Sequence, residues 1–273
     1  MKKTNSVLLS TPYLLWMAAF TLVPLGVVGY YALTDPSTGV FTLGNLKNLG
    51  MYLPVLWKSI AYSFVSAMIC LLLGYPVAYY IAHCSETAQK FLYMLIMLPM
   101  CMSFLLRTLA WVGLLQDTGI INSLLAKIGL PTLRLIRTPG AVVLGMVYNY
   151  LPYMILPLYA TLVKIDRRLI EAAEDLGCTP VQVFHKVVFP LSMPGILSGM
   201  TMVFVPAVST FYISQKLGNG KFFLIGDAIE GQYVANNLHF AAAIAFILML
   251  ILLACMTAVK YVTARYVYGG DEE

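Results

Sequence analysis

The stretch Thr138–Val163, TPGAVVLGMVYNYLPYMILPLYATLV, contains no Asp, Glu, Lys, Arg or His. About 20 apolar residues in a helix cross the ~30 Å hydrocarbon core of a bilayer, so the stretch predicts a transmembrane helix. Four more runs share this property and another is interrupted only by Arg107; they are Thr4–Thr34, Ser59–Ala82, Phe91–Gln116, Val187–Gln215 and Phe240–Val259. We therefore expect an all-α polytopic protein of six transmembrane helices. Pro190 and Pro194 are expected to delay the start of the fifth.

The composition agrees with a membrane protein. Hydrophobic residues make up 60% of the chain and charged residues 11%, whereas soluble domains carry roughly 25% charge. The 273 residues leave only short loops between the runs, so one membrane domain over residues 1–273 is expected. The five cysteines form no CxxC pair, which favours neither a zinc site nor a disulfide framework, and no cofactor or metal is expected.

The basic residues indicate an orientation. Six spans put both termini on one side of the membrane. That side carries nine basic residues and the other side seven, so the count alone is only weak evidence for which side is cytoplasmic. Lys2, Lys3 and the Lys164–Arg168 cluster flank helix ends on the same side, and such residues mark the cytoplasm. We expect both termini in the cytoplasm. The net charge of +5 then reflects these loops and lipid contact, and no nucleic-acid partner is expected.

The loop after the fourth run, residues 164–190, predicts two short helices; we call it the elbow. Asp166 is a suitable N-cap for a helix over Arg167–Leu176, which has Leu169, Ile170, Ala173 and Leu176 on one face. Gly177 follows, a residue that commonly ends helices in the left-handed conformation.

A second elbow helix is expected to begin after Thr179. Pro180 suits the first helical position, and Gln182 completes a Thr-x-x-Gln capping box. Its apolar face consists of Val183, Phe184, Val187 and Val188, and Pro190 is expected to end it. The pattern predicts an amphipathic helix–glycine–helix element joined to two membrane helices.

The elbow resembles a known signature. Glu171-Ala172-Ala173, three residues, Gly177, nine residues, Val187, one residue and Phe189-Pro190 are similar to the EAA signature of the permeases of binding-protein-dependent ABC importers. Val187 stands where Ile is usual and Phe189 where Leu is usual. The resemblance implies that the elbow docks into a cleft of an ATPase subunit and couples ATP-driven closure to the membrane helices. A hairpin lying passively on the bilayer surface is the alternative.

Further segments resemble the spermidine/putrescine permeases, closest to the first of the two permease subunits. These segments are Leu73–Ala78, Phe104–Thr108, Leu151–Tyr159, Asp175–Gly177 and Pro190–Ile196. The resemblance implies a type I ABC importer fold, a partner permease, a dimer of ATPases, an extracytoplasmic solute-binding protein and a polyamine substrate. Permeases for iron or sulfate share some of these features. A self-sufficient secondary carrier or a channel is the alternative from another class.

Several polar residues within the runs are candidates for a solute path. Arg107 lies about 16 residues into its run, roughly 24 Å along a helix, which places it toward the outer leaflet. A charge in a span indicates a function or an internal partner, and snorkelling to the interface is the alternative. The other candidates offer aromatic faces and oxygens to a polyamine, and the alternative is that they form hydrogen bonds between neighbouring helices. They are Tyr148, Asn149, Tyr150, Tyr153, Ser209, Thr210 and Tyr212.

Asp227 and Glu230 are candidates for attracting a cation at the outer mouth, with a solvated helix face as the alternative. No catalytic motif is present. Gly218-Asn219-Gly220-Lys221 lacks the spacing of a P-loop, and Phe222 stands where Ser or Thr is required. The chain is therefore expected to be a transport subunit rather than an enzyme, with ATP hydrolysis on a separate chain.

Overall fold

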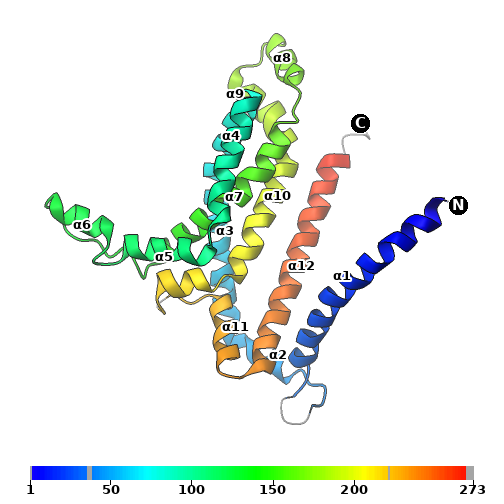
Figure 1. Ribbon diagram of the computed structural model, residues 1–273, viewed down its shortest axis with the longest axis vertical. Helices are drawn as coiled ribbons and strands as arrows, with labels where there is room; N and C mark the ends of the chain where they lie inside the picture. The colour runs from blue at the N-terminus through cyan, green and yellow to red at the C-terminus, as the bar shows by residue number, and fades with distance from the viewer. Residues whose placement is uncertain (1, 36–38, 221, 269–273) are drawn as a thin grey trace. The chain divides into compact units, whose positions relative to one another are not determined.

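The apolar runs form helices in the computed structural model, which describes residues 2–35, 39–220 and 222–268 (Figure 1). Side chains are described for residues 11–35, 39–47, 49–220 and 222–261. Within these residues six helical stretches are long and apolar enough to cross a membrane, which confirms the predicted number. They are Thr11–Ala32, Gly44–His83, Phe104–Lys127, Pro139–Leu162, Pro180–Ser209 and Leu238–Tyr261. The side chains of Lys2 and Lys3 lie outside the described residues, so the orientation of the termini stays a prediction.

The chain divides into two compact units, Met1–Pro54 with Ala228–Leu252 and Val55–Asp227 with Leu253–Glu273. The single domain expected over residues 1–273 stays a prediction. The first unit contains α1 (Lys2–Ala32), α2 (Gly44–Lys47), η1 (Asn48–Tyr52), most of α11 (Ile225–Val234) and the first half of α12 (Leu238–Tyr268). Aromatic rings join its parts: Tyr31 meets His239 edge-on at 5.0 Å, and Tyr52 meets Phe240 at 5.6 Å.

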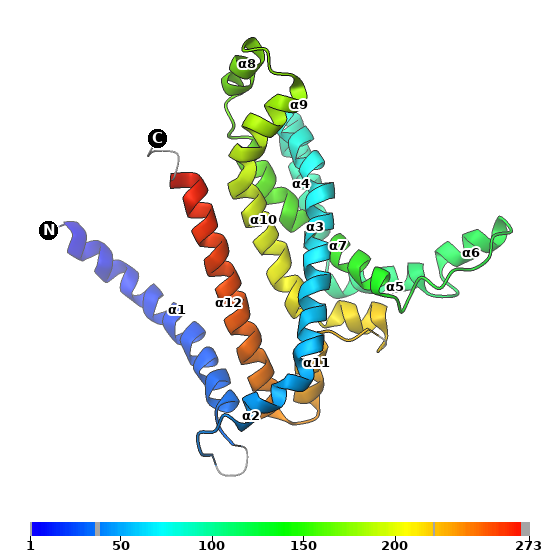
Figure 2. The ribbon, with the colours of Figure 1, turned by 180° about the vertical axis from the view of Figure 1, so that it is seen from behind.

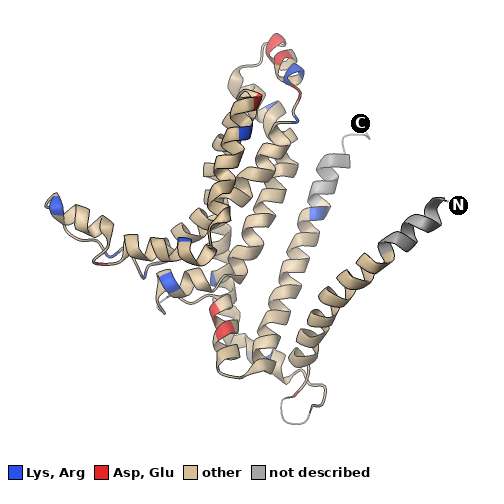
Figure 3. Ribbon diagram, viewed as in Figure 1, with Lys and Arg blue, Asp and Glu red and all other residues tan. Residues whose placement is uncertain are grey.

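The second unit contains the elbow and the most buried span. In chain order it holds most of α3 (Leu53–His83), α4 (Glu86–Met97), η2 (Leu98–Cys101), α5 (Phe104–Leu115), α6 (Ile120–Lys127), α7 (Pro139–Leu162), α8 (Arg167–Asp175), α9 (Pro180–Val183), η3 (Phe184–Val188), α10 (Phe189–Ser209) and η4 (Ser214–Gly218). Long charge-free stretches run through α3, α7 and α10, whereas α8 carries both signs of charge (Figure 3). Twelve of the 24 residues of α7 are buried, so α7 organises this unit.

Small residues allow α3 to pack closely on α7. The buried face of α3 is rich in Ser, Ala, Gly and Cys. Ser66 donates to the Met146 sulfur at 3.4 Å, and Cys70 donates to the carbonyl of Val147 at 3.7 Å. Between membrane helices such residues let the backbones approach, because lipid supplies no hydrophobic force to join them.

Helices α7 and α10 pack antiparallel through two glycines spaced four residues apart. A Cβ on Gly195 would lie 2.6 Å from the Thr161 hydroxyl and 3.0 Å from the Pro157 carbonyl. A Cβ on Gly199 would lie 2.7 Å from the Met154 sulfur. Since real Cβ atoms do not approach so closely, only glycine fits this contact without a shift of α7 or α10.

The third predicted span, Phe91–Gln116, is not one helix. Helix α4 ends at Met97, a 3₁₀ turn with Pro99 in its first positions follows, and Met102 is extended before α5 begins at Phe104. Proline has no N–H and clashes with the preceding turn, which explains the break. Helices α5 and α6 leave the direction shared by α3, α7 and α10 in both views (Figures 1 and 2). The depth calculated for Arg107 along a straight helix is therefore wrong.

Candidate coupling site and candidate solute path

The first elbow helix begins as its sequence predicts. Asp166 has an extended backbone, and its carboxylate accepts a hydrogen bond from the backbone N–H of Arg168 at 3.0 Å. This bond satisfies one of the N–H groups that the first turn of a helix leaves without a partner. The helix α8 then runs over Arg167–Asp175, one residue shorter than predicted.

Gly177 ends α8 in the left-handed conformation, with φ of +80°. The N–H of Cys178 donates to the carbonyl of Ala173 at 3.1 Å, and the N–H of Gly177 donates to the carbonyl of Glu174 at 2.8 Å. This pair of bonds is the Schellman motif. The side chains of Ala173 and Cys178 both pack on the core. The spacing of Ala173 and Gly177 therefore has a structural reason, since one residue supplies the carbonyl and the other the turn.

The second elbow helix also starts as predicted but does not end at Pro190. Thr179 and Gln182 form the reciprocal capping box, with bonds of 3.4 and 2.9 Å. The residues Phe184–Val188 form a π-turn, in which the N–H of Phe189 donates to the carbonyl of Phe184. The helix then continues into α10. Pro190 lies just after this π-turn and inside the continuous helix. The expectation that Pro190 and Pro194 break the helix is wrong.

The elbow exposes an apolar tip away from its packed side. Ile170, Ala173, Phe184 and Val187 pack on the core, and Val183 and Val188 are buried. Leu169 and Leu176, expected on the same covered face, are 49% and 86% exposed, and Val181 is 67% exposed. Glu171 and Ala172 are exposed beside them, as is Pro190. Large exposed apolar side chains on a short element that also carries exposed charges suit a contact with another protein.

Arg107 is buried rather than extended to an interface. Only 6% of its surface is accessible, and its Nε and Nη1 have no hydrogen-bond partner among the described residues. Its charge acts on the hydroxyl of Tyr150, which lies on α7. The snorkelling alternative is therefore wrong for this side chain, and an internal role follows from its burial.

Polar groups of α7 and of the end of α10 meet near the Arg107 charge. Tyr150 donates to the carbonyl of Pro206 at 3.3 Å, and Thr210, at the end of α10, is 7% exposed. Asn149 is fully buried; its amide nitrogen donates to the Gly145 carbonyl at 2.9 Å, while its Oδ1 accepts no bond from the described residues. An acceptor without a donor in a buried site is costly, which makes Asn149 a candidate contact for a passing ammonium group.

The remaining path candidates lie at the edge of this group. Tyr148 and Tyr153 are 39% and 36% exposed, and Tyr148 stacks edge-on against Trp111 at 5.3 Å. Ser209 bonds its own helix, at the carbonyls of Val205 and Pro206. The fifth run was predicted to extend to Gln215, but α10 ends at Ser209, so Tyr212 lies beyond the helix, with the Lys216 ammonium 5.6 Å above its ring. Because the Lys216 ammonium already contacts the face of this ring, Tyr212 is poorly placed to bind a cationic solute.

Asp227 is buried, contrary to the expectation of an exposed outer loop. It is 5% exposed, its Oδ1 accepts from the Ser214 hydroxyl at 3.0 Å, and its Oδ2 accepts from the backbone N–H of Leu224 at 2.7 Å. The carboxylate thus caps the start of α11. Glu230, on the same helix, is partly buried and engaged in an interaction. A solvated face is therefore wrong for Asp227, and attraction of a cation from solution does not explain it.

Replacement of Asp227 by alanine is expected to lower the free energy of unfolding by about 1–3 kcal/mol, because it leaves the Leu224 N–H without its acceptor in a buried site, while the Ser214 hydroxyl keeps the carbonyl of Phe211. Thermal unfolding of the protein in detergent measures the change. Asp117→Ala, at an exposed position, is the matched control and is expected to alter stability little. Equal stability of the two variants would contradict the capping role.

Three contributions were missed by reading the sequence. The close approach of Gly195 and Gly199 to α7 was detectable from their four-residue spacing. The exposure of Leu176 depends on how α8 sits on the core, which periodicity does not give. A hydrogen bond of 2.9 Å between Tyr75 of α3 and Ser192 of α10 has no sequence signal.

The elbow and the helices around it lie within a region that matches a known protein family. Residues 49–268 match the family described as "Binding-protein-dependent transport system inner membrane component". The chain belongs to this family. It is therefore the inner-membrane permease subunit of an ABC importer, and the alternative of a self-sufficient carrier or channel is set aside.

Relatives and solved structures agree with this membership. The spermidine/putrescine transport system permease protein PotB of Haemophilus influenzae is 36% identical over 256 residues, covering 90% of this permease and 89% of the relative. PotB of Escherichia coli K12 is 34% identical, covering 87% of this chain and 90% of its own.

The fold of the permease has counterparts among solved structures. A chain of a bacterial ABC transporter involved in the import of the acidic polysaccharide alginate superposes with a TM-score of 0.73 at 15% identity, covering 97% of this chain and 99% of its own. A chain of the MetNI methionine ABC transporter, in an inward-facing conformation, gives 0.59 at 17% identity, covering 81% and 98%. These likenesses confirm the predicted importer-permease fold.

Proposed function

We propose that this permease carries a polyamine, spermidine or putrescine, into the bacterial cytoplasm in a complex driven by ATP. The identity of 34–36% to PotB proteins over most of both chains is the observation that supports this substrate. In the proposal, a dimer of ATPases, a second permease subunit and an extracytoplasmic polyamine-binding protein complete the importer. The chain itself forms one permease domain, has both termini in the cytoplasm, and has no catalytic activity.

The elbow is proposed as the contact with the ATPase. Its exposed tip of Leu169, Leu176 and Val181 supplies apolar area, and Glu171 and Ala172 lie at the same surface. Ala173, Gly177 and Val187 hold the shape of the elbow, and the helix that continues through Pro190 joins it to α10 without a break. A push on the tip is therefore transmitted to a membrane helix rather than absorbed by a flexible loop.

The solute path is proposed along the outer part of α7 and the end of α10. Asn149 offers a buried carbonyl oxygen, Tyr148 and Tyr153 offer partly exposed rings, and ammonium groups favour both kinds of group. Arg107 repels a polycation, so in the proposal it bounds one wall of the path. The Pro206 carbonyl holds Tyr150 in place, Ser209, Thr210 and Tyr212 lie near the end of the path, and Asp227 and Glu230 contribute through the fold of α11.

Co-expression with candidate partner subunits tests the proposal. In proteoliposomes, binding protein loaded with spermidine or putrescine is expected to stimulate ATP hydrolysis by the complex, and the purified single chain is expected to hydrolyse none. Binding protein loaded with iron or sulfate is the control for the solute. Stimulation by those loads alone would overturn the polyamine assignment, and hydrolysis by the single chain would overturn the separate ATPase.

A further inference from the structure

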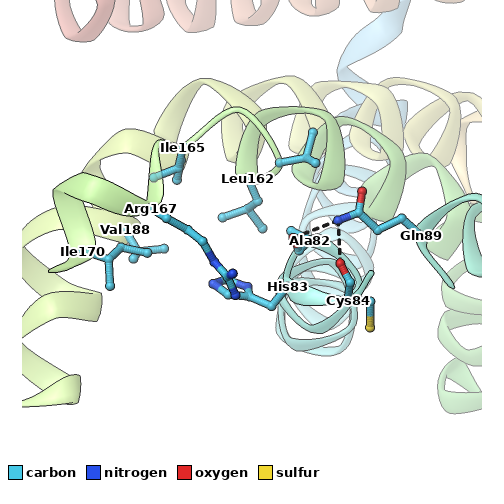
Figure 4. A pocket seen from close by; sticks show the side chains of 10 residues that line it. Ala82, His83, Cys84, Gln89, Leu162, Ile165, Arg167, Ile170 and Val188 are labelled. Carbon is cyan, nitrogen blue, oxygen red and sulfur yellow. Dashed lines mark hydrogen bonds between the residues drawn. The ribbon is translucent and has the colours of Figure 1, made fainter. Parts of the chain in front are cut away.

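A cavity of about 230 Å³ lies where the elbow meets the ends of three membrane helices (Figure 4). His83 ends α3, Gln89 lies in the first half of α4, Leu162 ends α7 and Arg167 begins α8. None of these residues belongs to the EAA signature or to the proposed solute path. The cavity is smaller than the roughly 300–1,000 Å³ that drug-sized ligands occupy, so it suits a single small group.

The lining of the cavity is positively charged on one side and apolar on the other. The residues that line it include Arg167 and His83 and no Asp or Glu. Figure 4 shows the Arg167 side chain directed toward the ring of His83, with Leu162, Ile170 and Val188 as apolar wall. The nearest carboxylate along the chain, that of Asp166, accepts the bond from Arg168 in the first turn of α8.

Hydrogen bonding decides which lining groups are open to a ligand. Nδ1 of His83 lies 2.8 Å from the carbonyl of Tyr79, and since a carbonyl only accepts, Nδ1 carries a hydrogen. Nε2 is left open to a ligand. Gln89 is already used: its nitrogen donates to the carbonyls of Ala82 and Cys84, and its oxygen accepts from Tyr159. A ligand therefore meets an arginine and a histidine.

We propose that this cavity binds a phosphate group. A guanidinium fork matches phosphate oxygens bidentately, and the ring of His83 adds a polar group beside it. The ends of transmembrane helices lie at the level of phospholipid headgroups, where basic pockets bind anionic lipids. The apolar wall fits the glycerol end of such a lipid, and free inorganic phosphate offers the same anionic group. Either occupant ties α3 and α7 to the first turn of the elbow, whatever solute the importer carries.

Native mass spectrometry of the full chain in detergent tests the proposal with two probes, phosphatidylglycerol and inorganic phosphate. Binding is expected to weaken about tenfold or more in Arg167→Ala, and further in Arg167→Ala with His83→Ala, because a charge-assisted contact is lost. Arg168→Ala is the matched control: it removes the same charge from the neighbouring position, which does not line the cavity.

The two probes distinguish the sources of the group. Binding of phosphatidylglycerol that depends on Arg167 assigns the site to a lipid headgroup, and binding of inorganic phosphate alone with that dependence assigns it to the free anion. Equal binding by the Arg167 and Arg168 variants would overturn the proposal. The proposal would also be overturned if the unaltered protein bound neither probe and Arg167→Ala lost ATPase capture. That result would indicate that the cavity binds a carboxylate of the partner protein.

Discussion

Replacement of Gly177 by valine is expected to abolish solute uptake while the protein still inserts at near-normal levels. A Cβ at this position meets no atom within 4 Å, so space is not the obstacle. The obstacle is φ of +80°, which costs a β-branched residue roughly 1–2 kcal/mol or more. The chain relieves this cost by opening the Schellman turn, which moves the exposed tip of α8 while the membrane helices remain packed. Uptake into membrane vesicles and capture of the ATPase measure the effect.

Gly177→Asn is the matched control, because asparagine tolerates the left-handed conformation better than other residues with a side chain. It is expected to keep most of the uptake that the valine variant loses. Glu171→Lys changes the charge of the same surface without bending the chain and is expected to weaken ATPase capture. Full uptake by the valine variant, with the ATPase bound, would show that the elbow is not the coupling element.

Replacement of Gly195 by leucine is expected to prevent the permease from accumulating as a folded protein. Its first side-chain atom alone would lie 2.6–3.0 Å from Thr161 and Pro157, and one of these contacts is backbone. Overpacking of this kind costs roughly 1–3 kcal/mol for modest insertions, and a leucine between two membrane helices adds more than a modest volume. Size-exclusion chromatography of the detergent-solubilised protein, with abundance in membranes, measures the loss.

Gly113→Leu provides the comparison, since Gly113 lies in α5 and a Cβ there meets no atom within 4 Å. Both substitutions introduce the same side chain into an apolar helix, so insertion into the membrane is affected equally. Only the contact with α7 differs. A monodisperse, abundant Gly195→Leu variant would show that α7 and α10 are not packed as closely as described.

Local signals in the sequence were sufficient for the start of both elbow helices. Asp166, Gly177, Thr179 and Gln182 act through bonds to residues within five positions, so their roles depend little on the rest of the fold. Hydropathy likewise gave the number of membrane-length helices, because a lipid environment forces backbone groups to bond within each helix.

Proline and burial were the points at which reading the sequence failed. Pro99 lies inside the predicted span Phe91–Gln116, but α4 ends just before it, whereas Pro190 was expected to end a helix but lies within a continuous one. The difference comes from the neighbouring turns, a 3₁₀ turn in one case and a π-turn in the other, which no residue type specifies. Asp227 and Arg107 are buried because of tertiary packing, which the hydropathy of their own segments does not reveal.

The π-turn between α9 and α10 has a consequence for the length of this segment. Because the helix is unbroken from Pro180 to Ser209, the rotation of the elbow about the helix axis is fixed relative to that of the membrane span. Each residue of a helix accounts for about 100° of rotation and 1.5 Å of rise. Insertion or deletion of one residue at Phe184–Val188 would therefore turn the elbow about a quarter of a revolution relative to the face that α10 presents to α7. Surface connections usually tolerate such changes in length, but this one is a fixed spacer.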